Sequence, residues 1–160
     1  MKSEDCSIMW LPPLYTNADG TDVVVGVTAA SEWFTQYHTI VSLSETRLPP
    51  SMLPLVQPGF GGDYPTAREL IVSRLETIGL PYSLVDSFPF FAIVELAFSS
   101  SGFWASNAAA WLPHFEFDES FANVLLQFTL DKQHSQSVRH LIAKHLRRWE
   151  KTRGITLLRP

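Results

Sequence analysis

The sequence predicts one globular domain over residues 1–160, of the α+β (or α/β) class, with a small mixed sheet and about four helices. Two observations lead to this prediction. The β-branched run VVVGVT at residues 23–28 is typical of a buried strand. Apolar residues recur at helical spacing in three later segments, and the last two of these are C-terminal.

The first third of the chain is predicted to contain the sheet. A turn at Asn17–Gly20 precedes the strand at residues 23–28. Two interpretations remain open for the next segment. A short helix could begin near Ser31, or Tyr37–Leu43 could form a second strand, because polar and apolar residues alternate there.

Residues 48–65 contain five prolines and three glycines, which predicts a long loop. Thr66 and Glu69 then match a capping box at the start of a helix. Its apolar stripe ends at Gly79, so we expect the helix to end there.

The most apolar stretch is residues 88–113, and we interpret it as the core. A membrane-spanning helix needs roughly 20 mostly apolar residues. Glu95 and the polar run at Ser99–Gly102 interrupt this stretch, so we expect no transmembrane span. A buried strand over Phe90–Phe98 and a short helix near Ser106–Leu112 fit the pattern better.

The C-terminal segment is predicted to form two helices. Asp118 is a candidate cap for the first, and Phe121, Val124, Leu125 and Phe128 follow it at helical spacing. The second helix covers about residues 135–152, with Val138, Leu141, Ile142, His145 and Trp149 on one face and Gly154 as its end. Residues 155–158 could add a short strand.

The single cysteine, Cys6, cannot form an intramolecular disulfide, and the acidic N-terminal residues do not resemble a secretory signal. We therefore expect a cytoplasmic protein. No cofactor motif is recognisable, so no cofactor is expected and no catalytic residue is assigned.

Charge is distributed unevenly along the chain. Residues 1–131 hold 4 basic and 15 acidic side chains, whereas residues 132–160 hold 8 basic and 1 acidic. An acidic body suits a basic protein partner, and aromatic side chains beside the carboxylates would supply binding energy. The residues that we predict to bind a partner are Asp19, Asp22, Phe60, Asp63, Tyr64, Trp104, Glu116 and Glu119.

Two alternative functions are open. His114, Glu116 and Asp118 alternate with phenylalanines, so an extended segment would place three candidate metal ligands on one face, as in a small-ligand or metal-dependent enzyme. The basic terminal helix could instead contact nucleic acid through Arg147 and Arg148, although the acidic body would repel phosphate.

The terminal segment QSVRHLIAKHLRRWEKTRGI (residues 136–155) is a basic amphipathic helix at the end of a small acidic chain. In this general character the chain resembles the bacterial immunity proteins that neutralise polymorphic or contact-dependent toxins. The resemblance implies stoichiometric binding of a cognate toxin domain, without turnover or cofactor. If the toxin is a nuclease, the carboxylates would stand in for the phosphates of its substrate.

Overall fold

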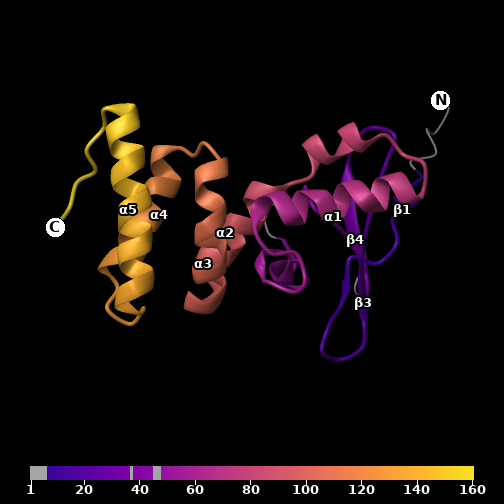
Figure 1. Ribbon diagram of the computed structural model, residues 1–160, viewed down its shortest axis with the longest axis horizontal. Coiled ribbons are helices and arrows are strands. Elements are labelled where there is room, and N and C mark those ends of the chain that lie inside the picture. The colour runs from indigo at the N-terminus through magenta and orange to yellow at the C-terminus, as the bar shows by residue number, and fades with distance from the viewer. Residues whose placement is uncertain (1–6, 37, 45–47) are drawn as a thin grey trace. The chain divides into compact units, whose positions relative to one another are not determined.

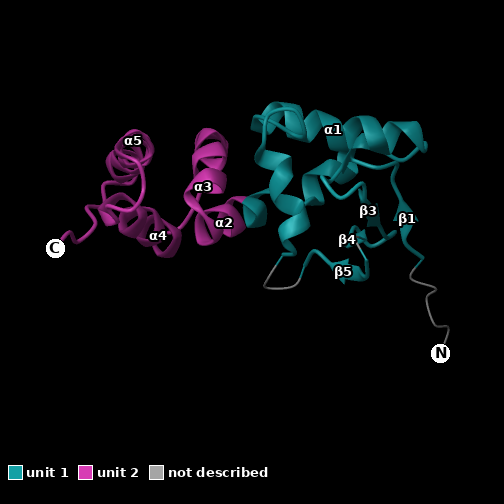
Figure 2. Cartoon of the chain, turned by 90° about the horizontal axis from the view of Figure 1, so that it is seen from below, with its two compact units in different colours: residues 1–93 teal, residues 94–160 magenta. Residues whose placement is uncertain are grey.

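The computed structural model describes residues 7–36, 38–44 and 48–160 (Figure 1). Cys6 and Tyr37 lie outside the described residues. Internal contacts group the chain into two compact units, unit 1 (residues 1–93) and unit 2 (residues 94–160) (Figure 2). The α+β class is confirmed, because the strands precede the helices in the chain. The expectation of one domain over residues 1–160 stays a prediction.

Unit 1 contains an antiparallel sheet, where we had expected a mixed one. The strand order is β1-β3-β4-β5, and β2 also pairs with β3. Alternate residues of β3 point into the core, where Val23, Val25 and Val27 are completely buried. The described strands are β1 (Met9–Trp10), β2 (Tyr15–Thr16), β3 (Asp22–Val27), β4 (Trp33–Gln36) and β5 (Ile40–Ser42).

The predicted strand at residues 23–28 is thus confirmed as β3. After Ser31 the chain forms strands β4 and β5, so the short-helix interpretation is wrong. The strand is favoured over the helix at Thr35, a β-branched residue that is buried in β4. It pairs with Val25 of β3 on one side and with Val41 of β5 on the other.

Three helical segments complete unit 1: η1 (Pro50–Val56), α1 (Tyr64–Thr77) and η2 (Tyr82–Ser87). The predicted loop at residues 48–65 therefore contains a 3₁₀-helix. α1 crosses one face of the sheet (Figures 1 and 2) and buries Ile71 and Leu75 completely. Trp33 of β4 donates its indole N–H to the hydroxyl of Ser87 at 2.9 Å, which links the sheet to η2.

The predicted buried strand at residues 90–98 is wrong, because this segment is helix α2 (Phe90–Ser100). Its buried residues follow helical spacing: Phe90, Ile93, Val94, Ala97 and Phe98. By length and composition alone, Tyr82–Ser100 is one candidate membrane span, with mean hydropathy 1.3 and 39% of it buried. Pro89 separates η2 from α2 within it, and α2 has 11 residues, fewer than the roughly 20 that a bilayer requires.

Unit 2 is helical. It contains residues 94–100 of α2, followed by α3 (Gly102–Ala108), η3 (Ala109–His114), α4 (Glu119–Leu130) and α5 (Gln136–Arg153). The helix predicted near residues 106–112 is therefore divided between α3 and η3. Residues 155–158 are not a strand.

Both predicted C-terminal helices are confirmed as α4 and α5. The Asp118 carboxylate accepts a hydrogen bond from the Phe121 N–H at 2.9 Å and caps α4. Gly154 ends α5 with a φ of 65°, a conformation that favours glycine. Leu141 is 41% exposed, so the buried face of α5 consists of Ile142, Leu146 and Trp149 and does not include Leu141.

Candidate functional site

The eight predicted partner-binding residues are divided between the two units. Asp19, Asp22, Phe60, Asp63 and Tyr64 belong to unit 1, and Trp104, Glu116 and Glu119 belong to unit 2.

Asp19 and Asp22 stabilise the turn between β2 and β3. The Asp19 carboxylate accepts a hydrogen bond from the Thr21 N–H at 2.9 Å. The Asp22 carboxylate accepts one from the Thr16 hydroxyl at 2.6 Å. Both residues are exposed, but their local hydrogen bonds make them poor choices for a mutation that should test binding alone.

An open groove of about 590 Å³ lies in unit 1 between α1 and the loop that follows η1. We call it the α1 groove. Its helical wall is a single face of α1, because the α1 residues that line it recur once per turn, at positions 65 and 66, then 69 and 70, then 73. The groove is lined by Phe60, Gly61, Pro65, Thr66, Glu69, Leu70 and Ser73.

Local sequence fixes the geometry of this groove. Asp63 caps α1, where its carboxylate accepts from the Thr66 N–H at 2.9 Å, and Pro65 occupies the first turn, where its missing N–H costs nothing. The predicted capping box at Thr66 and Glu69 is wrong, because α1 begins two residues before Thr66. A Cβ on Gly61 would lie 1.8 Å from the carbonyl oxygen of Leu55, so only glycine allows the loop to approach η1 this closely.

Phe60 forms the aromatic side of the groove and is 38% exposed. Its ring contacts the edge of Tyr15, with centroids 5.7 Å apart. Tyr15 is fixed in turn, because its hydroxyl donates to the Ser51 carbonyl at 2.5 Å and burial raises its pKa far above the ordinary value. Phe60 is therefore an exposed ring on a rigid support.

The ionisable side chain that lines the α1 groove is Glu69, which is exposed. The nearby guanidinium of Arg68 is 2.6 Å from the carboxylate of Asp86, and this contact raises the pKa of Arg68. The carboxylate of Asp86 thus balances the positive charge of Arg68. Unit 1 as a whole carries 4 basic and 10 acidic side chains, so the groove lies on a negatively charged unit.

Tyr64 does not line the groove. Its ring contacts the edge of Phe90, with centroids 5.3 Å apart, and this contact packs the start of α1 against the start of α2. Of the predicted residues in unit 1, Phe60 therefore lines the groove, and Asp63 lies at its edge, where it caps α1. Tyr64 packs against Phe90 instead.

The predicted residues of unit 2 lie on different elements. Trp104 on α3 contacts Phe103 edge to face, Glu119 lies exposed in the first turn of α4, and Glu116 borders a pocket beside α5. The candidate metal ligands are not arranged on a strand, because His114 ends η3 and Asp118 caps α4. Within residues 7–36, 38–44 and 48–160, no three histidine, cysteine or carboxylate side chains are grouped to hold a metal ion.

Most of the arginine and lysine side chains of α5 are exposed. Lys144, Arg147, Arg148 and Lys151 are exposed, and none of them forms an ion pair with a described residue. The helix packs on the rest of unit 2 through its apolar face, not through charge.

Of the seven residues that line the α1 groove, only Phe60 was among the predicted binding residues. The six others are Gly61, Pro65, Thr66, Glu69, Leu70 and Ser73. Glu69 had been assigned to a capping box. The signal that could have corrected this is Asp63, a strong capping residue placed two positions before Pro65.

No family model matches the chain, and no match was found among curated proteins or solved structures.

Proposed function

We propose that this chain is a cytoplasmic immunity protein that binds a cognate bacterial toxin domain stoichiometrically, and that the α1 groove is part of the binding surface. The observation that carries the proposal is the pairing of an exposed ring, Phe60, with an exposed carboxylate, Glu69, on the two sides of one groove. Aromatic anchors supply much of the energy of protein interfaces, and opposite charge accelerates encounter.

The groove suits a lysine or arginine side chain of the partner. The aliphatic part of such a side chain can lie against Leu70, Pro65 and the Phe60 ring, while its charged end reaches Glu69. The net negative charge of unit 1 favours a basic partner at longer range. A nuclease domain has such a basic surface, and Glu69 would then occupy the place of a phosphate.

Affinity capture with matched charge reversals tests this proposal. The tagged protein is expressed in its native cells as wild type, Glu69→Lys and Glu76→Lys, and retained proteins are quantified by mass spectrometry. Glu76 is a suitable control, because it is also exposed on α1 but does not line the groove. We expect one protein retained in equimolar amount by the wild type and by Glu76→Lys, and at least tenfold less of it with Glu69→Lys, because a like charge replaces an attractive one.

Equal retention by all three proteins would exclude the α1 groove as the binding surface. If Glu69→Lys and Glu76→Lys reduced the amount of retained protein equally, the net charge of the chain, and not the α1 groove, would determine binding. Circular dichroism of each variant checks that the fold is retained.

A further inference from the structure

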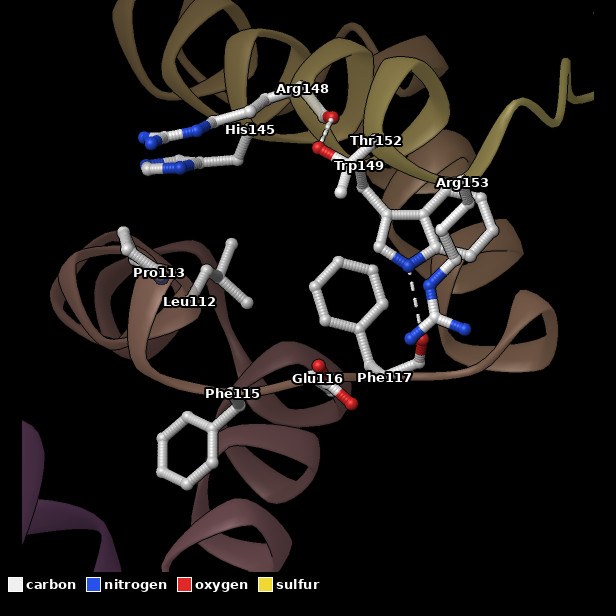
Figure 3. Close-up of a pocket in the computed structure, with 10 residues that line it drawn as sticks. All are labelled: Leu112, Pro113, Phe115, Glu116, Phe117, His145, Arg148, Trp149, Thr152 and Arg153. Atoms are coloured by element: carbon white, nitrogen blue, oxygen red, sulfur yellow. Dashed lines mark hydrogen bonds between the residues drawn. The ribbon is translucent and has the colours of Figure 1, made fainter.

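Unit 2 contains a pocket of about 310 Å³ between α5 and the segment that joins η3 to α4 (Figure 3). This volume is at the lower end of the range for small-molecule sites, roughly 300 to 1,000 Å³. The pocket is lined by Leu112, Pro113, Phe115, Glu116, Phe117, His145, Arg148, Trp149, Thr152 and Arg153.

One side of the pocket is a rigid aromatic wall. The rings of Phe117 and Trp149 are stacked, with centroids 5.6 Å apart and planes 7° from parallel. The indole N–H of Trp149 donates to the carbonyl oxygen of Phe117 at 3.0 Å. Since this bond satisfies the indole N–H, the wall offers the pocket an apolar surface.

The opposite part of the pocket is cationic. Figure 3 shows the Arg148 guanidinium and the His145 imidazole side by side, above Pro113 and Leu112. Burial, and then the nearby charges of Lys144 and Arg148, hold the pKa of His145 below its ordinary value. Near neutral pH the charged side chains of the pocket are therefore Arg148, Arg153 and Glu116.

The two arginines are placed differently. The Arg153 guanidinium lies 5.5 Å from the ring centroid of Trp149, so this ring already contacts it. The exposed Arg148 guanidinium forms no ion pair with any residue that the structure describes. Its fork of N–H donors matches a carboxylate.

We infer that this pocket binds a small organic anion, a carboxylate carried on a flat apolar body. The carboxylate would accept hydrogen bonds from Arg148, and the apolar body would lie between Leu112 and the wall of Phe117 and Trp149. An inorganic anion would leave the aromatic wall unused. An organic cation would be disfavoured because the two arginines, Arg148 and Arg153, outweigh the single carboxylate of Glu116 in the lining. The site lies wholly within unit 2 and does not depend on the proposed toxin partner of unit 1.

The experiment is an NMR titration of the ¹⁵N-labelled full chain with 2-naphthoate, and with the neutral 2-naphthamide as the matched ligand. Three proteins are compared: wild type, Arg148→Ala and Arg147→Ala. Arg147 is the control, because it is the neighbouring exposed arginine on α5 and does not line the pocket. All three spectra also show whether the fold is retained.

We expect naphthoate to shift the indole resonance of Trp149 in the wild type and in Arg147→Ala, with dissociation constants within twofold of each other. Arg148→Ala should weaken binding at least about tenfold, because a charge-assisted hydrogen bond is lost. Naphthamide should bind at least about tenfold more weakly than naphthoate to the wild type.

Three results would each overturn the inference. The first is no shift of the Trp149 indole at any naphthoate concentration that can be dissolved. The second is equal affinity for naphthoate and naphthamide, which would mean that the pocket does not recognise the charge. The third is equal weakening by Arg147→Ala and Arg148→Ala, which would indicate only general attraction to a basic helix.

Discussion

At the scale of single residues, Glu95 is the carboxylate within the most apolar part of the chain. It is exposed on α2, while the preceding residue, Val94, is completely buried. Burial, and then the negative charge of Asp118, raise the pKa of its carboxyl above the ordinary value. The folded state therefore binds a proton at Glu95 more tightly than the unfolded state does.

This shift predicts how stability depends on pH. The contribution of Glu95 to stability is present at low pH and is lost as the pH rises from about the unfolded value of 4.5 through the higher folded value. At pH 7 the ionised carboxylate is destabilising, so Glu95→Gln should raise the free energy of unfolding, by no more than about 0.5 kcal/mol. Urea unfolding followed by circular dichroism measures this difference.

The same comparison at a pH well below 4.5 is the control, because Glu95 is then protonated in both the folded and the unfolded state and the advantage of glutamine should disappear. A glutamine variant that is less stable than the wild type at pH 7 would contradict this interpretation. It would mean that the ionised carboxylate has a favourable partner in the folded state.

The residues at which helices begin or end were partly predictable from sequence. Asp118 and Gly154 were identified correctly, because each lies directly at the edge of an unambiguous apolar pattern. Asp63 was missed, because Thr66 and Glu69 form an equally acceptable local signal three residues later. The side-chain hydrogen bond that distinguishes the two possibilities exists only in the folded backbone.

At the scale of elements, the start of α1 can be tested directly. Asp63→Ala should lower the free energy of unfolding by about 1 kcal/mol, because the N–H of Thr66 loses its carboxylate acceptor. Thr66→Ala should cost less than about 0.5 kcal/mol, since Thr66 is exposed and is not the cap. Urea unfolding of both variants checks this prediction.

If Thr66→Ala lowered the free energy of unfolding more than Asp63→Ala, the capping box at Thr66 would be correct after all. It would also place the start of α1, and hence the helical wall of the α1 groove, differently from the structure.

Helix α2 illustrates where sequence patterns fail. Residues 90–98 are all apolar except Glu95, so neither a strand period nor a helix period is visible in the sequence. A length of 11 residues lies near the boundary between long strands and short helices. Ala92, Leu96 and Ala97 favour the helix by propensity. In the structure Ile93 and Ala97, four residues apart, are both completely buried, as helical spacing allows.

At the scale of the whole molecule, the uneven charge seen in the sequence follows the division into units. Unit 1 has 4 basic and 10 acidic side chains, and unit 2 has 8 basic and 6 acidic. The α1 groove with Glu69 lies in the negative unit, and the pocket with Arg148 lies in the positive one. The two units therefore suit ligands of opposite charge.

Neither concave site could be predicted from sequence. The α1 groove joins Phe60 on a loop to Glu69 on a helix, and the unit 2 pocket joins Glu116 to residues about 30 positions later on α5. Composition indicated an acidic, aromatic surface, and Phe60, one of the residues predicted for it, lines the α1 groove. The tertiary packing that brings Phe60 and Glu69 to one groove has no local signature.

The central claim is that this chain neutralises a toxin, and growth rescue tests it most directly. The protein retained in equimolar amount by affinity capture is expressed from an inducible promoter, alone or together with this chain, and growth is recorded. We predict that expression alone stops growth, that the wild-type chain and Glu76→Lys restore it, and that Glu69→Lys does not. Unimpaired growth without this chain, or arrest that the wild-type chain does not relieve, would contradict the claim.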